Sequence, residues 1–136
     1  MAMIDKKVLV VDDDPDIADA ISMILESKGY QVVIAHDGIE CLNKLGTQKP
    51  DLIILDLLMP KMDGFAVYKE LRSPKWSEYR DIPVLILSSV REEASRRRYE
   101  LETGQDLKPD EYIEKPILPR VLLDCVGKLL KRKQQV

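Results

Sequence analysis

Short apolar runs rich in β-branched residues recur along the chain, and segments with helical periodicity separate them. Three runs are clear, at residues 7–11 (KVLVV), 52–55 (LIIL) and 84–87 (VLIL), and two are weaker, at 31–35 (QVVIA) and 112–114 (YIE). Continuous apolar runs of this length are typical of strands that are buried on both faces. The pattern therefore predicts five strands.

The segment after the first run shows the periodicity of a helix. Ile17, Ile21 and Ile24 recur at steps of four and three, which places them on one helical face. Asp14 is a natural N-cap for this helix, and Pro15 suits its first position. Further helices are predicted at residues 39–45, 65–72, 92–101 and 118–129.

Strict alternation of strands and helices predicts an α/β fold. Buried strands joined by helices pair in parallel with right-handed crossovers, so that helices cover both faces of the sheet. We expect a doubly wound, five-stranded parallel sheet with the strand order 2-1-3-4-5. Residues 1–136 suit one domain, because domains commonly have about 100 to 200 residues. No repeat or linker divides the chain, so a single domain without an output domain is expected.

Composition and charge exclude several classes of partner. Apolar residues make up 45% and charged residues 33% of the chain, as in ordinary globular proteins. The net charge of -3 provides no general attraction to DNA or to an anionic membrane. No apolar run approaches the roughly 18 to 20 residues that cross a bilayer, and the start, MAMIDKK, lacks the apolar stretch of a signal peptide. We expect a cytoplasmic protein without nucleic-acid or membrane partners.

Several reactive or charged side chains have ordinary structural roles in this pattern. Cys41 and Cys125 lie among apolar residues without a CxxC pair, so both are expected to be buried structural thiols. His36 is expected at the surface, beyond the second strand. The arginines at 96–98 are expected to form a solvated helix face.

Residues with functional chemistry gather at the carboxyl ends of the predicted strands. In strand order they are Asp12 and Asp13, then Asp56, Ser88 and Lys115. In an open parallel sheet this edge is where ligands bind, at the point where the strand order reverses. The reversal in the order 2-1-3-4-5 lies between strands one and three. The three aspartates would therefore face one crevice, and the serine and the lysine would flank it.

The residue types at this edge indicate phosphoryl transfer assisted by a metal ion. Three carboxylates in one crevice repel one another unless a cation lies among them. Mg2+ typically binds one or two carboxylates and completes its octahedron with water and phosphate oxygens. Asp56, alone at its strand end, suits a nucleophile that forms an aspartyl phosphate, whereas the adjacent Asp12 and Asp13 suit metal binding. Lys115 would neutralise charge on the phosphoryl group, and the hydroxyl of Ser88 would hydrogen-bond to it.

Four segments resemble, in order and spacing, the receiver domain of response regulators, in particular chemotaxis-type receivers. They are VLVVDDDPDI, PDLIILDLLMPKMDGF, IPVLILSS and YIEKP, and the resemblance covers nearly the whole chain. It implies a flavodoxin-like fold, Mg2+ on Asp12 and Asp13, and phosphorylation of Asp56. It also implies that Lys115 contacts the phosphoryl group and that Ser88 is the hydroxyl switch residue.

The same resemblance implies three further features. The main-chain carbonyl of Leu58 would be a metal ligand, and Tyr112 would be an aromatic switch residue whose rotamer is coupled to Ser88. A half-buried strand residue is the alternative for Tyr112. The Lys115-Pro116 bond is often cis in receivers, and X-Pro bonds have little of the usual preference for trans.

The chain departs from the receiver pattern in two places. The connection between Gly104 and Tyr112 is longer than the tight turn of ordinary receivers, which puts partner assignments from relatives in doubt. Leu58 and Val90 are apolar at positions that border the phosphoryl site. Because apolar side chains cannot orient an attacking water, we expect a long-lived phosphoryl group.

These observations predict a phosphoacceptor of a two-component or phosphorelay system. A histidine kinase or phosphotransfer protein would donate the phosphoryl group to Asp56. Phosphorylation would then change the face formed by the fourth helix, the fifth strand and the fifth helix. The protein would act as a monomer or a phosphorylation-dependent dimer on a downstream protein, and it would catalyse only its own phosphorylation and dephosphorylation. The alternative is a receiver-like interaction module that does not depend on phosphorylation.

Two other classes fit the residues poorly. Phosphohydrolases with an aspartyl nucleophile have a DxD motif, with a second Asp two residues after the nucleophile. Here Leu58 occupies that second position. A flavin-binding protein of similar topology would place DDDPD against a phosphate, where a hydroxyl-rich or glycine-rich loop is expected.

Overall fold

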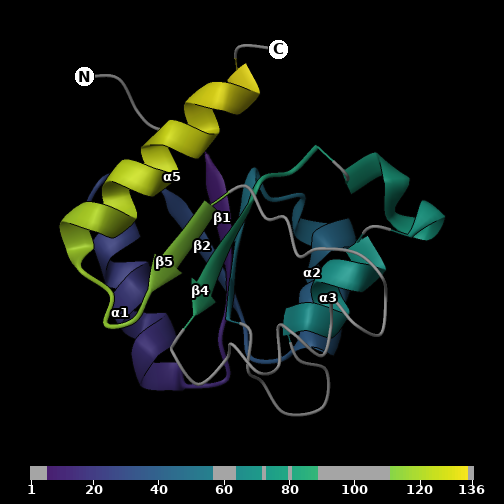
Figure 1. Ribbon diagram of the computed structural model, residues 1–136, viewed down its shortest axis with the longest axis horizontal. Helices are drawn as coiled ribbons and strands as arrows, with labels where there is room; N and C mark the ends of the chain where they lie inside the picture. Colours follow the sequence, from purple (N-terminus) through teal and green to yellow (C-terminus); the bar gives the residue numbers. More distant parts are fainter. Residues whose placement is uncertain (1–5, 57–63, 72, 80, 89–110, 135–136) are drawn as a thin grey trace.

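The computed structural model describes residues 6–56, 64–71, 73–79, 81–88 and 111–134, without the side chains of residues 64, 65, 88, 111, 112 and 132–134. Five parallel strands form one sheet in the order β2-β1-β3-β4-β5 (Figure 1). The strands are β1 (Lys7–Val11), β2 (Gln31–Ala35), β3 (Leu52–Asp56), β4 (Val84–Ser88) and β5 (Glu111–Glu114). The predicted fold class and strand order are confirmed.

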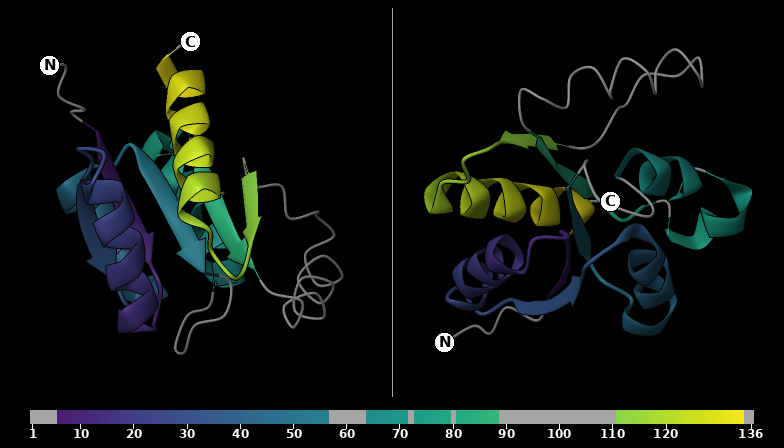
Figure 2. Two further views of the ribbon diagram at one scale, coloured as in Figure 1. Left: turned by 90° about the vertical axis from the view of Figure 1, so that its left-hand side faces the viewer. Right: turned by 90° about the horizontal axis from the view of Figure 1, so that it is seen from below.

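Helices cover both faces of this sheet. They are α1 (Pro15–Glu26), α2 (Gly38–Gln48), α3 (Gly64–Leu71) and α5 (Pro119–Gln134), with a 3-10 helix, η1 (Pro74–Tyr79). Seen from below, α1 and α5 lie on one side of the sheet, and α2 and α3 lie on the other (Figure 2). The arrangement is the doubly wound architecture that the alternation of elements predicted.

Each face of the sheet has its own hydrophobic core, because successive strand residues point to opposite sides. In β1, Leu9 and Val11 belong to the core beneath α2 and α3. Val8 and Val10 belong to the core beneath α1 and α5. All of these side chains are fully buried, as expected for a central strand with helices on both sides.

Aspartate side chains cap the N-termini of two helices. Asp14 caps α1 by accepting a hydrogen bond from the main-chain N–H of Asp16 at 2.9 Å, and Pro15 takes the first helical position, as predicted. Asp37 caps α2 by accepting a hydrogen bond from the N–H three residues on, that of Glu40, at 2.8 Å.

Element boundaries differ slightly from the prediction. β3 and β4 each extend one residue further, and β5 begins one residue earlier. The predicted helices 39–45, 65–72 and 118–129 correspond to α2, α3 and α5, while the helix predicted at 92–101 lies outside the described residues. The cis peptide expected at Lys115-Pro116 is present.

The 3-10 helix η1 was not predicted, because residues 74–79 (PKWSEY) show no helical periodicity. It lies at the end of the sheet opposite the carboxyl ends of the strands (Figure 1). Trp76 packs against the core beneath α2 and α3 and donates a hydrogen bond from Nε1 to Glu70 at 2.9 Å. This anchoring is a tertiary contact, which a local pattern does not reveal.

The two cysteines differ from each other. Cys41 is fully buried, as predicted, and burial raises the pKa of its thiol to about 12. Cys125 is only partly buried, so the prediction of a buried thiol was wrong there, because α5 packs this position at the margin of the core. His36 is exposed, as expected.

Candidate metal centre at the carboxyl edge of the sheet

Three aspartates meet where β1 and β3 end. Asp12 and Asp13 directly follow β1, and Asp56 is the last residue of β3. Because β1 and β3 are paired in parallel register, with Val11 beside Leu55, the residues that follow them lie side by side. One carboxylate oxygen from each aspartate lies within 4.8 Å of the others. The three carboxylates therefore lie together at this edge of the sheet, as the strand order predicted.

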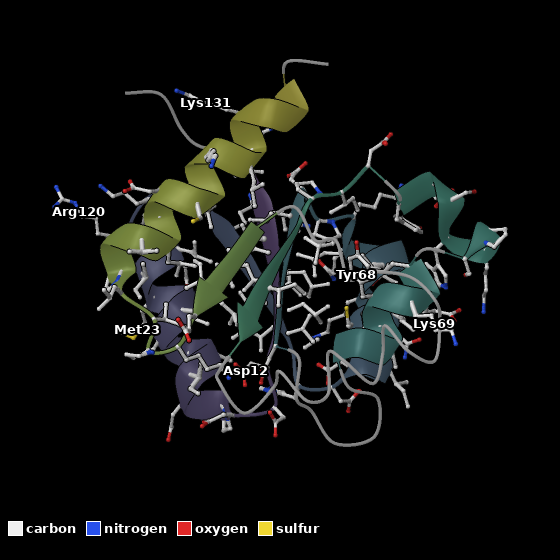
Figure 3. The ribbon with its side chains drawn as sticks, in the orientation of Figure 1. Asp12, Met23, Tyr68, Lys69, Arg120 and Lys131 are labelled. Carbon is white, nitrogen blue, oxygen red and sulfur yellow. The ribbon has the colours of Figure 1, made fainter. Side chains whose placement is uncertain are left out.

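Asp12 is held from two sides. Its main-chain N–H donates to the carbonyl of Ala35 at 3.0 Å, which ties it to the end of β2. Its Oδ1 accepts a hydrogen bond at 3.0 Å from the main-chain N–H of Asp14, at the start of α1. The side chain is fully buried at the lower end of the sheet (Figure 3).

The electrostatics of Asp12 reflect this burial. The pKa of Asp12 is raised from 3.8 to about 6, chiefly because burial removes the carboxylate from water. The charges of Asp56 and Asp13 contribute to this rise, while the N–H of Asp14 and the charge of Lys115 oppose it. Among the described residues, its Oδ2 is the one buried side-chain polar atom without a hydrogen-bond partner. Buried polar atoms in native proteins normally have a partner.

Lys115 completes the cluster from the fifth strand end. Its Nζ lies 3.1 Å from Oδ1 of Asp56, which is an ion pair between a partly exposed ammonium and a buried carboxylate. Lys115 follows β5, and β5 is separated from β3 by β4 alone. The sheet order therefore brings the lysine across to the aspartate, as the sequence predicted.

Comparison with known proteins identifies the family. Residues 8–127 match the model of the response regulator receiver domain. The chain belongs to this family. No helix among the described residues of this receiver is long and apolar enough to cross a membrane.

Several relatives are similar over nearly the whole receiver. The alkaline phosphatase synthesis transcriptional regulatory protein PhoP of Bacillus subtilis is 40% identical over 95% of this chain and 50% of its own length. The signal receiver domain of a histidine kinase from Syntrophus aciditrophicus is 35% identical, with a TM-score of 0.78, over 93% of this chain and 90% of that one. The chemotaxis response regulator CheY4 of Vibrio cholerae is 32% identical, with a TM-score of 0.75, over 93% of this chain and 99% of CheY4.

The receiver spans about half the length of the curated relatives it matches. About half of each of those longer proteins has no counterpart in this chain. What the comparisons show is a receiver domain of two-component signalling with a flavodoxin-like fold.

The residues of this receiver fit a hard divalent cation. Each of the three aspartates offers a carboxylate oxygen, the kind of ligand that Mg2+ prefers. Oδ2 of Asp12, which has no partner in the described part of the chain, is suited to a cation or to one of its waters, and the exposed Asp13 opens the cluster to solvent. Asp12, Asp13 and Asp56 are thus the residues that would hold the ion.

Other predicted site residues are described only in part. Ser88 ends β4 beside Glu114 of β5, and Tyr112 pairs with Ile86, so both backbones are placed in the sheet. Their side chains, and hence their switch roles, stay predictions. Leu58, Val90, residues 96–98 and most of the connection from Gly104 to Tyr112 lie outside the described residues.

One contribution to the site was not predicted, although the sequence contains a signal for it. Aspartates at 12, 14 and 16 are spaced by two, and Asp side chains readily accept from the N–H two residues on. The structure shows two such bonds in series, from Asp14 to Asp12 and from Asp16 to Asp14. The interpretation of Asp14 as a helix cap was correct but incomplete.

Proposed function

We propose that this receiver accepts a phosphoryl group on Asp56 from a phosphohistidine donor, with Mg2+ held by Asp12, Asp13 and Asp56. The observation that carries the proposal is the grouping of three carboxylates within 4.8 Å, with the ammonium of Lys115 3.1 Å from Asp56. A structural role alone gives no reason to bury two carboxylates at one edge, because burying charge destabilises a fold.

Transfer of the phosphoryl group from the donor to Asp56 needs no further reactant. A carboxylate oxygen of Asp56 forms a bond to phosphorus, the bond from phosphorus to the imidazole nitrogen of the donor breaks, and the nitrogen keeps the electron pair. Lys115, whose Nζ lies 3.1 Å from Oδ1 of Asp56, would neutralise charge on the phosphoryl oxygens. The bound Mg2+ would supply further charge neutralisation on the same oxygens.

The remaining family roles complete the proposal. The carbonyl of Leu58 would be a further metal ligand, and the Ser88 hydroxyl would follow the phosphoryl group. Tyr112 would change rotamer with Ser88, so that β5 and α5 carry the signal together with the segment before β5. The change would shift an existing equilibrium between two states, as local charge switches generally do.

The surface beside Lys115 suits contact with the donor protein. An apolar pocket of about 340 Å³ lies between α1 and residues 115–117, and Lys115 lines it. Met23, on the same helix, is 72% exposed (Figure 3). A donor that reaches Asp56 must cover this neighbouring surface, and an apolar side chain of a histidine kinase or phosphotransfer protein would fill the pocket.

Phosphorylation by acetyl phosphate with Mg2+ tests the chemistry without a donor protein. Intact-mass measurement should show one added phosphoryl group on the wild-type chain and none on Asp56→Asn or in EDTA. Asp51→Asn, an identical change at the opposite edge of the sheet, should label normally. Labelling of Asp56→Asn would refute the assignment, and an unlabelled wild type would favour an interaction module that does not depend on phosphorylation.

Substitution of Ala20 tests the donor contact separately. Ala20 is exposed and lines the pocket, so Ala20→Arg should obstruct it without disturbing the core. Transfer from a phosphohistidine protein that labels the wild-type chain should slow, while labelling by acetyl phosphate should not change. Equal slowing of both reactions would contradict a docking role.

A further inference from the structure

Two hydrogen bonds in series connect helix α1 to the acidic cluster. The N–H of Asp16 donates to Oδ1 of Asp14 at 2.9 Å, and the N–H of Asp14 donates to Oδ1 of Asp12 at 3.0 Å. The carbonyl of Asp14 also accepts the first helical hydrogen bond, from Ala18 at 3.0 Å. Asp14 thus joins the first turn of α1 to a candidate metal ligand.

The second of these bonds sets the orientation of the Asp12 carboxylate. Oδ1 is engaged by the N–H of Asp14, and Oδ2 is buried without a partner among the described residues. The direction of that N–H depends on the backbone of Asp14, which has φ -88 and ψ 110, the extended conformation of an N-cap. A change in the cap would therefore change which way Oδ2 faces.

We propose that Asp14 is a positioning residue for the metal centre. Its carboxylate fixes the first turn of α1, and the fixed turn holds its own N–H against Asp12, so that Oδ2 of Asp12 stays directed into the cluster. The inference rests on the proposed function, because it assigns Asp14 a part in the same Mg2+ site. Partners that orient a metal ligand in this way commonly affect metal affinity strongly.

Helix α2 provides an internal comparison. Asp37 also caps α2 with its side chain, but it accepts from the N–H three residues on, that of Glu40, at 2.8 Å. The N–H that engages Oδ1 of Asp12, however, belongs to Asp14. Loss of either cap should destabilise its helix. Ala35 and His36, which precede the α2 cap, contact Asp12 through its main chain, so only loss of the Asp14 cap should disturb the orientation of the Asp12 carboxylate.

A charge effect and a positioning effect predict different outcomes at residue 14. The carboxylate of Asp14 is exposed, and its negative charge alone would attract a cation to the neighbourhood. Asn and Ser cap helices about as well as Asp but carry no charge. They should therefore retain the Mg2+ affinity if Asp14 acts through position, and lose it if Asp14 acts through charge.

Isothermal titration calorimetry with Mg2+ on the full chain at pH 8 is the test. Asp14→Ala should weaken binding by about threefold to tenfold, less than the tenfold to hundredfold typical when a ligand's direct partner is lost, because the main-chain N–H remains. Asp14→Asn and Asp14→Ser should bind Mg2+ within twofold of the wild type, about the experimental error. Asp37→Ala should do the same, although its urea midpoint falls about as far as that of Asp14→Ala.

Each contrary result has a distinct meaning. Equal weakening by Asp14→Asn and Asp14→Ala would show a charge effect and overturn the inference, and so would an unchanged affinity in Asp14→Ala. Weakening by Asp37→Ala would indicate general loosening of the helices and would also overturn it. A wild-type chain that binds no Mg2+ would refute the proposed metal centre itself, which separates that failure from failure of the positioning role.

Discussion

Replacement of Asp12 by Asn tests the cost of burying a carboxylate at this edge. The side chain of Asp12 is fully buried, and its Oδ2 has no hydrogen-bond partner among the described residues. Asn keeps the shape and the oxygen that accepts from the N–H of Asp14, but it removes the charge. The metal-free variant should therefore be more stable than the wild type at neutral pH.

The pKa of Asp12 gives the magnitude. Burial raises it from 3.8 to about 6 in the folded chain, and each pKa unit corresponds to about 1.4 kcal/mol. The folded state therefore holds the proton more tightly than the unfolded state does. The stabilising effect is fully present below about pH 4 and is lost as the pH rises through about 6. We expect Asp12→Asn to gain about 1 to 3 kcal/mol at pH 7, where the wild type is ionised.

Urea unfolding in EDTA measures this difference. Trp76 is the only tryptophan and is partly buried against the core beneath α2 and α3, so its fluorescence should follow unfolding. The gain of Asp12→Asn should be present at pH 7 and nearly absent at pH 4. Saturating Mg2+ should stabilise the wild type at pH 7 and have little effect on the variant. Asp19→Asn, an identical change at an exposed position of α1, is the control and should show no such pH dependence.

Two results would refute the reasoning. If Asp12→Asn were less stable than the wild type at pH 7 in EDTA, the buried charge would not destabilise the fold. If its advantage were the same at pH 4 and pH 7, the gain would come from packing or hydrogen bonding and not from ionisation.

Three further predictions concern the framework around the site. Ile54→Ala should lower the free energy of unfolding by about 2 to 5 kcal/mol in urea, since Ile54 is fully buried in a central strand, and a loss under about 1 kcal/mol would contradict this. Asp51→Ala should lower it by about 1 to 3 kcal/mol, because its carboxylate accepts from the N–H of Lys7 at 2.9 Å; an unchanged midpoint would count against that bond. A disulfide reagent at pH 8 should modify Cys125 well before Cys41, whose pKa of about 12 and full burial leave almost no accessible thiolate, and rapid labelling of a Cys125→Ser variant would contradict this.

The strands and their order could be predicted because a strand that is buried on both faces needs a continuous run of apolar residues, which is easy to recognise in a sequence. β3 contains Leu52 to Leu55 without interruption, and all four side chains are buried. The positions at which strands end are harder to predict. Asp56 belongs to β3 by its backbone pairing with Leu87, although its side chain is a carboxylate of the candidate site. Because Asp56 is polar, an apolar pattern does not include this last position of the strand.

The candidate site could be predicted because topology determines it. Parallel pairing of β1 with β3 brings Asp12 and Asp56 together once the strand order is known. The hydrogen bond from Asp14 to Asp12 and the anchoring of Trp76 on Glu70 have a different origin. They depend on the direction of individual bonds after packing, and residue types at fixed spacing constrain such directions only weakly.

Burial of Asp12 connects stability and metal binding through one physical cause. Removal of this carboxylate from water destabilises the metal-free fold at neutral pH, and the same removal strengthens its attraction to a cation, because the surroundings screen charge less than water does. The N–H of Asp14 stabilises the negative charge at Oδ1, whereas Oδ2 has no hydrogen-bond partner among the described residues. A cation bound at Oδ2 would therefore offset the destabilisation that the buried carboxylate causes in the metal-free fold. Since proton and Mg2+ would compete for the same carboxylate, the affinity for the metal should rise as the pH passes the pKa of Asp12.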